Sequence, residues 1–306
     1  MASMLHLVGR YIAHRRRLGY QLNDASRLLA AFARFCARTA PGRPLTTDLA
    51  LRWANERPGL KPKTRASRLS MVRGFASYCV ALDPRTEVPA ARLLCSNWQR
   101  GTPHIFTPEE VRLILQRARR LQTRCSPLHA RTYATLIGLL ACTGIRPGEA
   151  IRLRLSDFDA HGGTLHIGRC KFSPERTIPL HPSCVRALRN YRQARLRTFP
   201  FGDSFFIATR GRALAPRRVE EVFRKLSAAI VSRGNRPVVR LYDFRHTFAT
   251  RLIARWSQQS RPPAHHLILL SRYLGHRGFN STWWYVSSDY RSLQSAALRF
   301  GNFHQS

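Results

Sequence analysis

The sequence predicts a mainly α-helical protein with a small antiparallel β-sheet, divided into two domains. The chain has 306 residues, which is more than a single hydrophobic core usually serves. Apolar residues recur at helical spacing along most of its length. Short strand-like runs occur in one stretch, about residues 158–180, where Gly162-Gly163 and Ser173-Pro174 interrupt them. These three observations together predict an all-helical first domain and an α+β second domain.

The first 82 residues form the predicted N-terminal helical domain. Apolar residues keep a helical period there, and capping or breaking residues separate the periodic segments. Four helices are expected: over about residues 5–18, from Asn23 or Asp24 onward, from Thr46 or Thr47 to just before Pro58-Gly59, and over about 64–82.

The fourth of these helices carries a row of basic residues opposite its apolar face. No acidic residue interrupts the segment between Lys61 and Ala81. Such a row can be an ordinary solvated face, but the missing acids favour contact with DNA phosphates. The predicted DNA-binding ridge consists of Lys61, Lys63, Arg65, Arg68 and Arg73.

A linker is expected at residues 83–103, where three prolines and one glycine break the periodicity. The second domain, residues 104–306, begins with a capping box, because Thr107 is followed by Pro108 and then by Glu110. Its helices are expected over about 108–121, 127–142, 183–197, 216–231, 242–256, 264–274 and 281–288. A further amphipathic segment, about 293–300, could pack on its own domain or on a neighbouring protomer.

The charge of the chain predicts its partner. The formal net charge is +36, and arginine supplies most of it, since the only lysines are Lys61, Lys63, Lys171 and Lys225. A soluble small domain typically carries a net charge of about 2–8. We therefore expect a polyanionic partner, namely double-stranded DNA.

The cysteines and apolar runs exclude several other classes of protein. The seven cysteines lack the paired spacings of a disulfide framework or a zinc site. The longest apolar run, about residues 133–145, is too short to cross a bilayer, and the N-terminus lacks the apolar core of a signal peptide. We expect a reduced cytoplasmic protein with no metal, no cofactor and no membrane partner.

Five residues in the second domain suit attack of a tyrosine on a phosphodiester. Two guanidiniums can bind a phosphate through paired hydrogen bonds, and a phenol can act as a nucleophile. The 16 acidic residues do not cluster here, as the ligands of a two-metal nuclease would. In chain order the five are Arg146 in Thr143-Gly144-Ile145-Arg146, Lys171, Arg245 in Tyr242-Asp243-Phe244-Arg245-His246, His276 in Leu274-Gly275-His276, and Tyr285.

Four of the five also have a structural interpretation. Arg146 could be a buried arginine paired with Glu149, and Lys171 could be a solvated hairpin lysine. His276 could be a structural histidine after a helix end. Tyr285 could belong to an aromatic cluster with Trp283 and Trp284. Their order and spacing, with Tyr285 nine residues after His276, favour the functional interpretation.

These motifs resemble those of the tyrosine recombinases, the phage integrase family, over nearly the whole chain. The resemblance implies that Arg146 and Arg245 bind the scissile phosphate and that His276 donates a hydrogen bond to it. It also implies that Lys171 is the general acid and Tyr285 the nucleophile, with Tyr290 too far along the chain for that role. The fold implied is a helical core-binding domain followed by an α+β catalytic domain.

The chain departs from the family pattern at two positions. Phe172 replaces the glycine that usually follows the hairpin lysine, and Tyr242 replaces the histidine three residues before the second arginine. A phenol is a poor base at neutral pH but a good hydrogen-bond donor. We therefore expect Tyr242 to take the place of that histidine and to position, through a hydrogen bond to a phosphate oxygen, rather than to accept a proton.

The resulting hypothesis is a site-specific DNA recombinase that forms a 3′-phosphotyrosine intermediate. It would serve integration, excision or transposition of a mobile element, as a homo- or hetero-tetramer on DNA associated with the bacterial nucleoid. Two alternatives stay open: a catalytically silent DNA-binding relative, which Tyr242 favours, and a relaxase resembling type IB topoisomerases.

Overall fold

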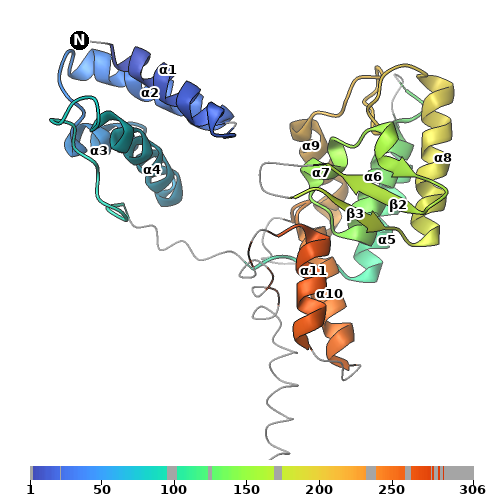
Figure 1. The fold of residues 1–306 in the computed structure, drawn as a ribbon. Helices are drawn as coiled ribbons and strands as arrows, with labels where there is room; N and C mark the ends of the chain where they lie inside the picture. The colour runs from blue at the N-terminus through green and yellow to red at the C-terminus, as the bar shows by residue number, and fades with distance from the viewer. Residues whose placement is uncertain are drawn as a thin grey trace, which may run out of the picture. The chain divides into compact units, whose positions relative to one another are not determined.

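The computed structural model describes residues 3–20, 22–94, 102–122, 126–168, 174–231, 239–258 and 263–276, together with Gly278, Thr282 and Tyr285. Over these residues the chain is mostly helical with a three-stranded antiparallel sheet (Figure 1), as the sequence predicts. The chain divides into two compact units, Met1–Arg100 and Gly101–Ser306. None of the helices described is both long enough and apolar enough to cross a membrane.

The first unit consists of four helices around one apolar core. They are α1 (Met4–Arg17), α2 (Asn23–Thr39), α3 (Thr47–Asn55) and α4 (Pro62–Cys79). The rings of Phe32 and Trp53 meet edge to face at 5.2 Å between centroids in the middle of this core. Because Val8, Phe32, Trp53 and Phe75 come one from each helix and are all buried, the core holds all four helices together.

The helix starts in this unit agree with the sequence in one case and differ in another. Thr46 caps α3 as predicted, because its Oγ1 accepts a hydrogen bond from the amide of Leu49 at 3.3 Å. For α2 the predicted cap is wrong. The N-cap is Leu22, in a left-handed conformation with φ of 47°. Asp24 lies inside the first turn and its carboxylate pairs with Arg27, so it does not cap the helix.

The chain after α4 packs back on the first unit. The amide of Glu87 donates to the carbonyl of Leu45 at 2.8 Å. The Glu87 carboxylate accepts a hydrogen bond from the amide of Thr47 at 2.8 Å, at the N-terminus of α3. A negative charge is favourable at that end of a helix. At least this part of the predicted linker is thus anchored to the first unit.

In the second unit, helices pack against one small sheet (Figure 1). Strands β1 (Phe158–Asp159), β2 (Thr164–Ile167) and β3 (Arg176–Pro179) form an antiparallel meander in that order. The helices are α5 (Pro108–Arg119), α6 (His129–Thr143), α7 (Pro147–Ile151), α8 (Pro182–Thr198), α9 (Pro216–Val231), α10 (Asp243–Gln258) and α11 (Pro263–Leu274), with a 3₁₀ turn at Leu155–Asp157. The capping box predicted at Thr107 and Glu110 is present.

Helix α6 is the central element of the second unit. It packs against α5, α7, α8 and α10, and its residues Leu136, Ile137 and Leu140 are buried in the main core. A second, smaller apolar cluster lies between α10 and α11. It consists of Ala249, Ile253, Leu267, Leu270, Leu274 and Tyr285. Since α10 contacts both clusters, it links the main core to the end of the described chain.

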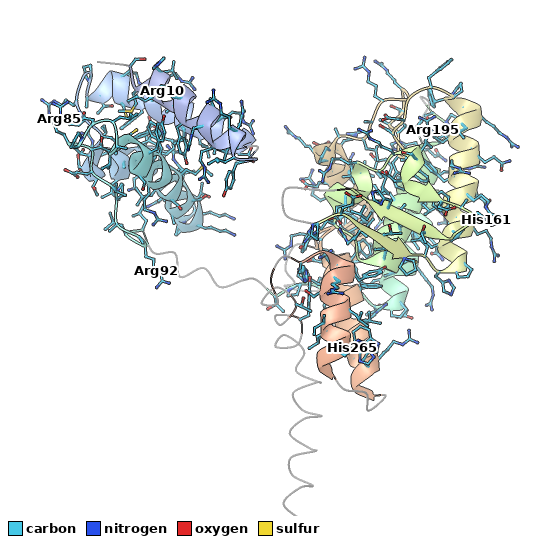
Figure 2. The ribbon with its side chains drawn as sticks, viewed as in Figure 1. Arg10, Arg85, Arg92, His161, Arg195 and His265 are labelled. Carbon is cyan, nitrogen blue, oxygen red and sulfur yellow. The ribbon has the colours of Figure 1, made fainter. Side chains whose placement is uncertain are left out.

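Arginine side chains extend from both units (Figure 2). Arg10 and Arg92 are exposed in the first unit, as expected for a protein with such a large positive charge. Arg195 on α8 differs, because it is completely buried and donates to the carbonyls of Phe201 and Gly202 at 2.9 and 2.7 Å. Some of the arginines therefore stabilise the fold and are not available to a partner.

The turn after α6 requires glycine. Gly144 has φ of 61°, and a Cβ atom placed there would lie 2.7 Å from Cδ1 of Phe248. Gly144→Ala is expected to lower the free energy of unfolding of the second unit by about 2 kcal/mol, through backbone strain and this clash. Thermal unfolding of the full chain measures the change.

Gly138, inside helix α6, is the matched control. A Cβ atom there meets nothing closer than Cδ2 of Leu115 at 3.9 Å. Gly138→Ala is therefore expected to stabilise the unit by about 0.5–1 kcal/mol, because alanine is the better helix former. Equal effects of the two substitutions would show that the Gly144 turn imposes no constraint.

Candidate active site

Arg146 is held at the junction of two helices. Helix α6 ends at Thr143, and the left-handed Gly144 reverses the chain so that α7 begins directly after Arg146. The Thr143 hydroxyl donates to the carbonyl of Leu139 at 2.6 Å, and Ile145 is buried in the core. The backbone at Arg146 is therefore fixed from both sides, while its side chain keeps 21% of its surface exposed.

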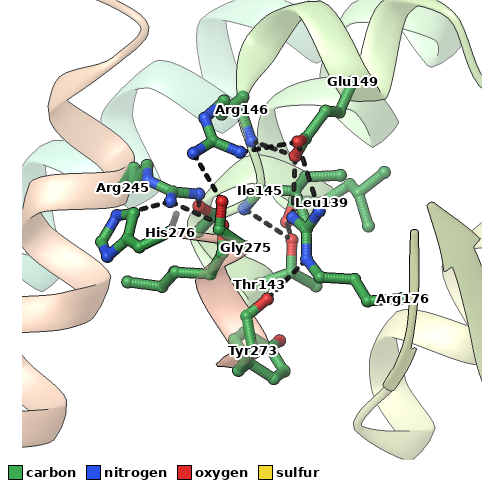
Figure 3. A network of polar contacts seen from close by, with 12 residues as sticks. Leu139, Thr143, Ile145, Arg146, Glu149, Arg176, Arg245, Tyr273, Gly275 and His276 are labelled. Carbon is green, nitrogen blue, oxygen red and sulfur yellow. Dashed lines mark hydrogen bonds and ion pairs between the residues drawn. The ribbon is translucent and has the colours of Figure 1, made fainter. Parts of the chain in front are cut away.

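Glu149 binds two guanidiniums at once (Figure 3). Its Oε1 accepts from Arg146 Nη1 at 2.9 Å, and its Oε2 accepts from the Arg146 amide at 3.0 Å. On its other side, Arg176 donates from Nη2 to Oε2 at 2.9 Å and from Nη1 to Oε1 at 3.3 Å. The pair with Glu149 that the structural interpretation of Arg146 predicts is thus present, although the Arg146 side chain is partly exposed and not buried.

The two arginines keep this buried carboxylate ionised. Burial by itself raises the pKa of Glu149, but hydrogen bonds and charge attraction from Arg176, and then from Arg146, lower it to about 2. The Glu149 side chain is 1% exposed, so water contributes little to its stabilisation. The carboxylate therefore depends on both guanidiniums for its charge.

Arg245 lies at the centre of the site and is completely buried. It donates from Nη1 to the carbonyl of Gly144 at 3.1 Å and from Nη2 to the carbonyl of Leu274 at 2.7 Å. Arg146 likewise donates to the carbonyl of Gly275 at 2.9 Å. The carbonyls that end α6 and α11 thus attract both cations, because the C-terminus of a helix carries partial negative charge. Burial lowers the pKa of Arg245, but arginine starts so high that it stays cationic at neutral pH.

His276 is neutral and bonded at both ring nitrogens. Its Nε2 accepts a hydrogen bond from Arg245 Nη2 at 2.8 Å, since arginine has only donors. Its Nδ1 then carries the proton and donates to Thr282 Oγ1 at 2.7 Å. Burial, followed by the charges of Arg245, Arg146 and Arg176, lowers the pKa of His276 to about 3.

Tyr285 lies beside these groups, with 2% of its surface exposed. Its ring stacks on that of His276 at 5.9 Å between centroids. Burial raises the pKa of the phenol, and the positive charge and hydrogen bonding of Arg245 oppose that shift. The phenol is therefore protonated at neutral pH, and its hydroxyl lies within reach of a cation that favours the phenolate.

The structure thus brings together four of the predicted site residues: Arg146, Arg245, His276 and Tyr285. Tyr242 lies at their edge, 39% exposed, with its ring 5.2 Å from that of His246. Lys171 and Phe172 fall outside the described residues, as do the predicted tail segment 293–300 and most of the helix expected at 281–288.

Sequence reasoning missed Arg176. The available signal was its alternation with Ile178 on β3, because residues two apart on a strand share a face and Ile178 is buried. An arginine on such a face requires a buried acceptor. Its Nε donates to the carbonyl of Tyr273 at 2.7 Å, so it also ties β3 to α11.

The structure contradicts the prediction for one residue of the DNA-binding ridge, Arg68. Lys61 and Lys63 are exposed, and Arg65 and Arg73 are half-buried. Arg68 is buried, with its guanidinium 4.0 Å above the Trp53 ring and a 2.7 Å hydrogen bond to the Trp53 carbonyl. The turn of the helix points it into the core, where it stabilises the contact of α4 with α3.

Comparison with known proteins identifies the family. The model of the phage integrase family matches residues 104–292. The protein y4rB of Sinorhizobium fredii (strain NBRC 101917 / NGR234), which has an inferred assignment as an integrase/recombinase, is 35% identical over 308 residues, covering 98% of this chain and 97% of that protein. Tyrosine recombinase XerC of Mycobacterium sp. (strain KMS) is 28% identical, covering 83% of this chain and 86% of its own. The chain therefore belongs to the phage integrase family, the tyrosine recombinases.

Solved structures share the fold. The Tn1549 transposon integrase, in complex with transposon right end DNA, aligns with a TM-score of 0.70 at 17% identity, over 98% of this chain and 100% of that one. The XerH site-specific recombinase, bound to a palindromic difH substrate, aligns with a TM-score of 0.64 at 20% identity, over 90% of this chain and 78% of that one.

The Glu149 network generates a stability prediction. Glu149→Gln is expected to lower the free energy of unfolding of the second unit by about 3 kcal/mol at pH 7, because two guanidiniums lose their carboxylate. The pKa of Glu149 in the folded chain, about 2, lies below its ordinary value of 4.5. Its stabilising contribution is therefore complete above pH 4.5 and is lost as the pH falls toward 2. Urea unfolding at a series of pH values measures both effects.

The control for this prediction is Glu221→Gln. Glu221 pairs with Arg217 and Arg218 on the surface, where water and salt screen the interaction. Little change in stability is expected there. If Glu149→Gln were equally neutral and kept the wild-type loss of stability in acid, Glu149 would not be the ionised link between the arginines.

Proposed function

We propose that this chain cuts and rejoins DNA strands by site-specific recombination through a covalent bond to Tyr285. The convergence of Arg146, Arg245, His276 and Tyr285 from separate segments of the second unit carries this proposal. The family of the chain supports it independently. No single motif of the four would be sufficient, because each also has a structural use.

In the proposed reaction the Tyr285 oxygen attacks the phosphorus and the phenol releases its proton to water. The bond from phosphorus to the 5′ oxygen breaks, and a 3′-phosphotyrosine remains. Arg146 and Arg245 bind the two non-bridging oxygens, on which charge builds in the transition state. Removing one such donor typically lowers a rate by about 10²–10³.

Lys171 is the proposed general acid, which protonates the departing 5′ oxygen. In the sequence it lies between β2 and β3, and β3 begins with Arg176, which bonds Glu149. A 5′ hydroxyl of another strand then attacks the phosphotyrosine, releases Tyr285 and reseals the DNA. Energy is conserved in the covalent bond, so no nucleotide hydrolysis is required.

His276 needs one change before it can bind the phosphate as the family pattern implies. Its Nε2 accepts from Arg245, so it has no proton to donate. If Arg245 turns its Nη2 toward a phosphate oxygen and the proton of His276 moves from Nδ1 to Nε2, that atom becomes a donor. Thr282 at Nδ1 can then donate instead of accept, since a hydroxyl does both.

We further propose that the two domains have different roles. Residues 1–82 would bind DNA, 83–103 would link, and 104–306 would catalyse. Double-stranded DNA is the proposed substrate, bound by a homo- or hetero-tetramer at the bacterial nucleoid. The assignment of y4rB as an integrase/recombinase and the transposon origin of the Tn1549 integrase favour integration, excision or transposition of a mobile element.

Tyr285→Phe is expected to abolish covalent adducts between the protein and DNA 3′ ends, because phenylalanine lacks the nucleophilic oxygen. Adducts formed on host genomic DNA are isolated under denaturing conditions and sequenced, which maps the site. A nicked half-site made from the mapped sequence then traps the adduct for rate measurements. Arg245→Lys should slow adduct formation by about 10²–10³, since lysine cannot replace the forked guanidinium.

Tyr290→Phe is the matched control and should form adducts at the wild-type rate. Adducts that persist in Tyr285→Phe would refute the assignment of the nucleophile. DNA binding with no adduct from the wild-type chain would identify the catalytically silent relative instead. Relaxation of supercoils with no recombinant product would identify a relaxase.

The ridge on α4 generates a separate prediction. Lys61→Ala and Lys63→Ala should each weaken DNA binding equally for all sequences and reduce the slope of log affinity against log salt by about 1. Arg68→Met should instead destabilise the first unit and leave the slope unchanged, because Arg68 is buried on Trp53. Fluorescence anisotropy at several salt concentrations measures the slopes, and unchanged slopes in both lysine variants would remove the ridge from the DNA interface.

A further inference from the structure

Two aromatic rings, those of His276 and His246, contact Tyr285. His276 stacks on it at 5.9 Å with 20° between the ring planes. His246 lies 5.3 Å away at an angle of 58°. Since Tyr285 is also packed among the apolar residues of α10 and α11, its ring has few orientations available.

His246 is itself supported by Tyr242. The two residues are four apart along the chain at the start of α10, so their side chains lie one above the other. Their rings meet edge to face at 5.2 Å and 61°. Tyr242 is 39% exposed and His246 is half-buried, so three rings lead from the surface to the nucleophile in the order Tyr242, His246, Tyr285.

We propose that His246, supported by Tyr242, is a positioning residue for the attack by Tyr285. This inference rests on the proposed function and assigns a role to the departure at position 242. The usual histidine there has a smaller ring than tyrosine. In this chain the larger ring of Tyr242 contacts His246, and His246 in turn contacts Tyr285.

The two imidazoles act differently on the nucleophile. His276 keeps its hydrogen bond to Thr282 when Arg245 turns to the phosphate, so its ring remains a fixed surface against the Tyr285 ring. His246 contacts the ring at a steep angle from α10 and opposes its rotation away from Arg245. An aromatic contact is worth about 0.5–1.5 kcal/mol, and that energy corresponds to a factor of about 2–13 in the fraction of attack-ready rings.

The test compares three substitutions of His246 in the full chain. His246→Ala removes the ring, His246→Phe keeps a ring without nitrogen, and His246→Asn keeps a polar amide without a ring. Single-turnover adduct formation is measured on the nicked half-site, and DNA affinity is measured on the same duplex. We expect about tenfold slower adduct formation in the alanine and asparagine variants, with affinity within about twofold of wild type. The phenylalanine variant should form adducts within about threefold of the wild-type rate.

Tyr242 provides the second half of the test. Tyr242→Ala should slow adduct formation in the same direction, and Tyr242→Phe should slow it less, because the phenylalanine variant loses the hydroxyl but keeps the ring that contacts His246. The double variant Tyr242→Ala/His246→Ala should be no slower than His246→Ala alone, since Tyr242 acts through His246. Tyr242 is substantially exposed, so its variants remain informative even if the His246→Ala variant folds poorly.

Three results would overturn the inference. The first is wild-type speed in His246→Ala. The second is activity in His246→Asn combined with its loss in His246→Phe, which would assign the role to a ring nitrogen. The third is additivity of the Tyr242 and His246 effects. If the wild-type chain forms adducts and His246→Ala does so equally, this inference alone fails; if the wild-type chain forms none, the proposed function fails with it.

Discussion

The site depends on the ion pairs that the buried carboxylate of Glu149 makes with Arg146 and Arg176. The carboxylate binds the side chain and the amide of Arg146 on one side and Arg176 on the other, so α7 and β3 meet at one group. Arg176 extends the link to α11 through the carbonyl of Tyr273. In the network of Figure 3, Glu149 pairs with the guanidiniums of Arg146 and Arg176, and Arg245 bonds backbone carbonyls and His276. The network therefore holds three guanidiniums and one carboxylate. The surplus of positive charge suits a phosphodiester, whose negative charge grows as the phosphorus is attacked.

The ends of two helices complete the anchoring. The carbonyls of Gly144 and Leu274 bind Arg245, and the carbonyl of Gly275 binds Arg146. Both guanidiniums are therefore placed by backbone atoms, which cannot change rotamer. Once Arg245 has turned its Nη2 to a bound phosphate, donors anchored in this way need no further reorganisation as charge develops, which is a main source of electrostatic stabilisation in enzymes. The left-handed Gly144 is required here, because it both ends α6 and presents its carbonyl to Arg245.

The surroundings of Tyr285 balance two opposing effects. The apolar cluster of α10 and α11 buries the phenol and raises its pKa, which keeps it protonated. Arg245 lowers the same pKa, so the cation that would bind the phosphate also favours the phenolate. Tyr242 lies exposed at the edge of this set. Its ring contact with His246 is consistent with a role in geometry.

The sequence by itself determined the mainly helical fold and the capping box at Thr107, and it offered the pairing of Arg146 with Glu149 as one interpretation. Each of these depends on residues within about one helical turn of each other, and periodicity and capping preferences record such neighbours. Only the tertiary structure decided that Arg176 shares Glu149, that Arg68 lies buried on Trp53, and that His246 contacts Tyr285. The two residues of each pair are far apart along the chain. The packing of whole elements, and not a local pattern, brings them together.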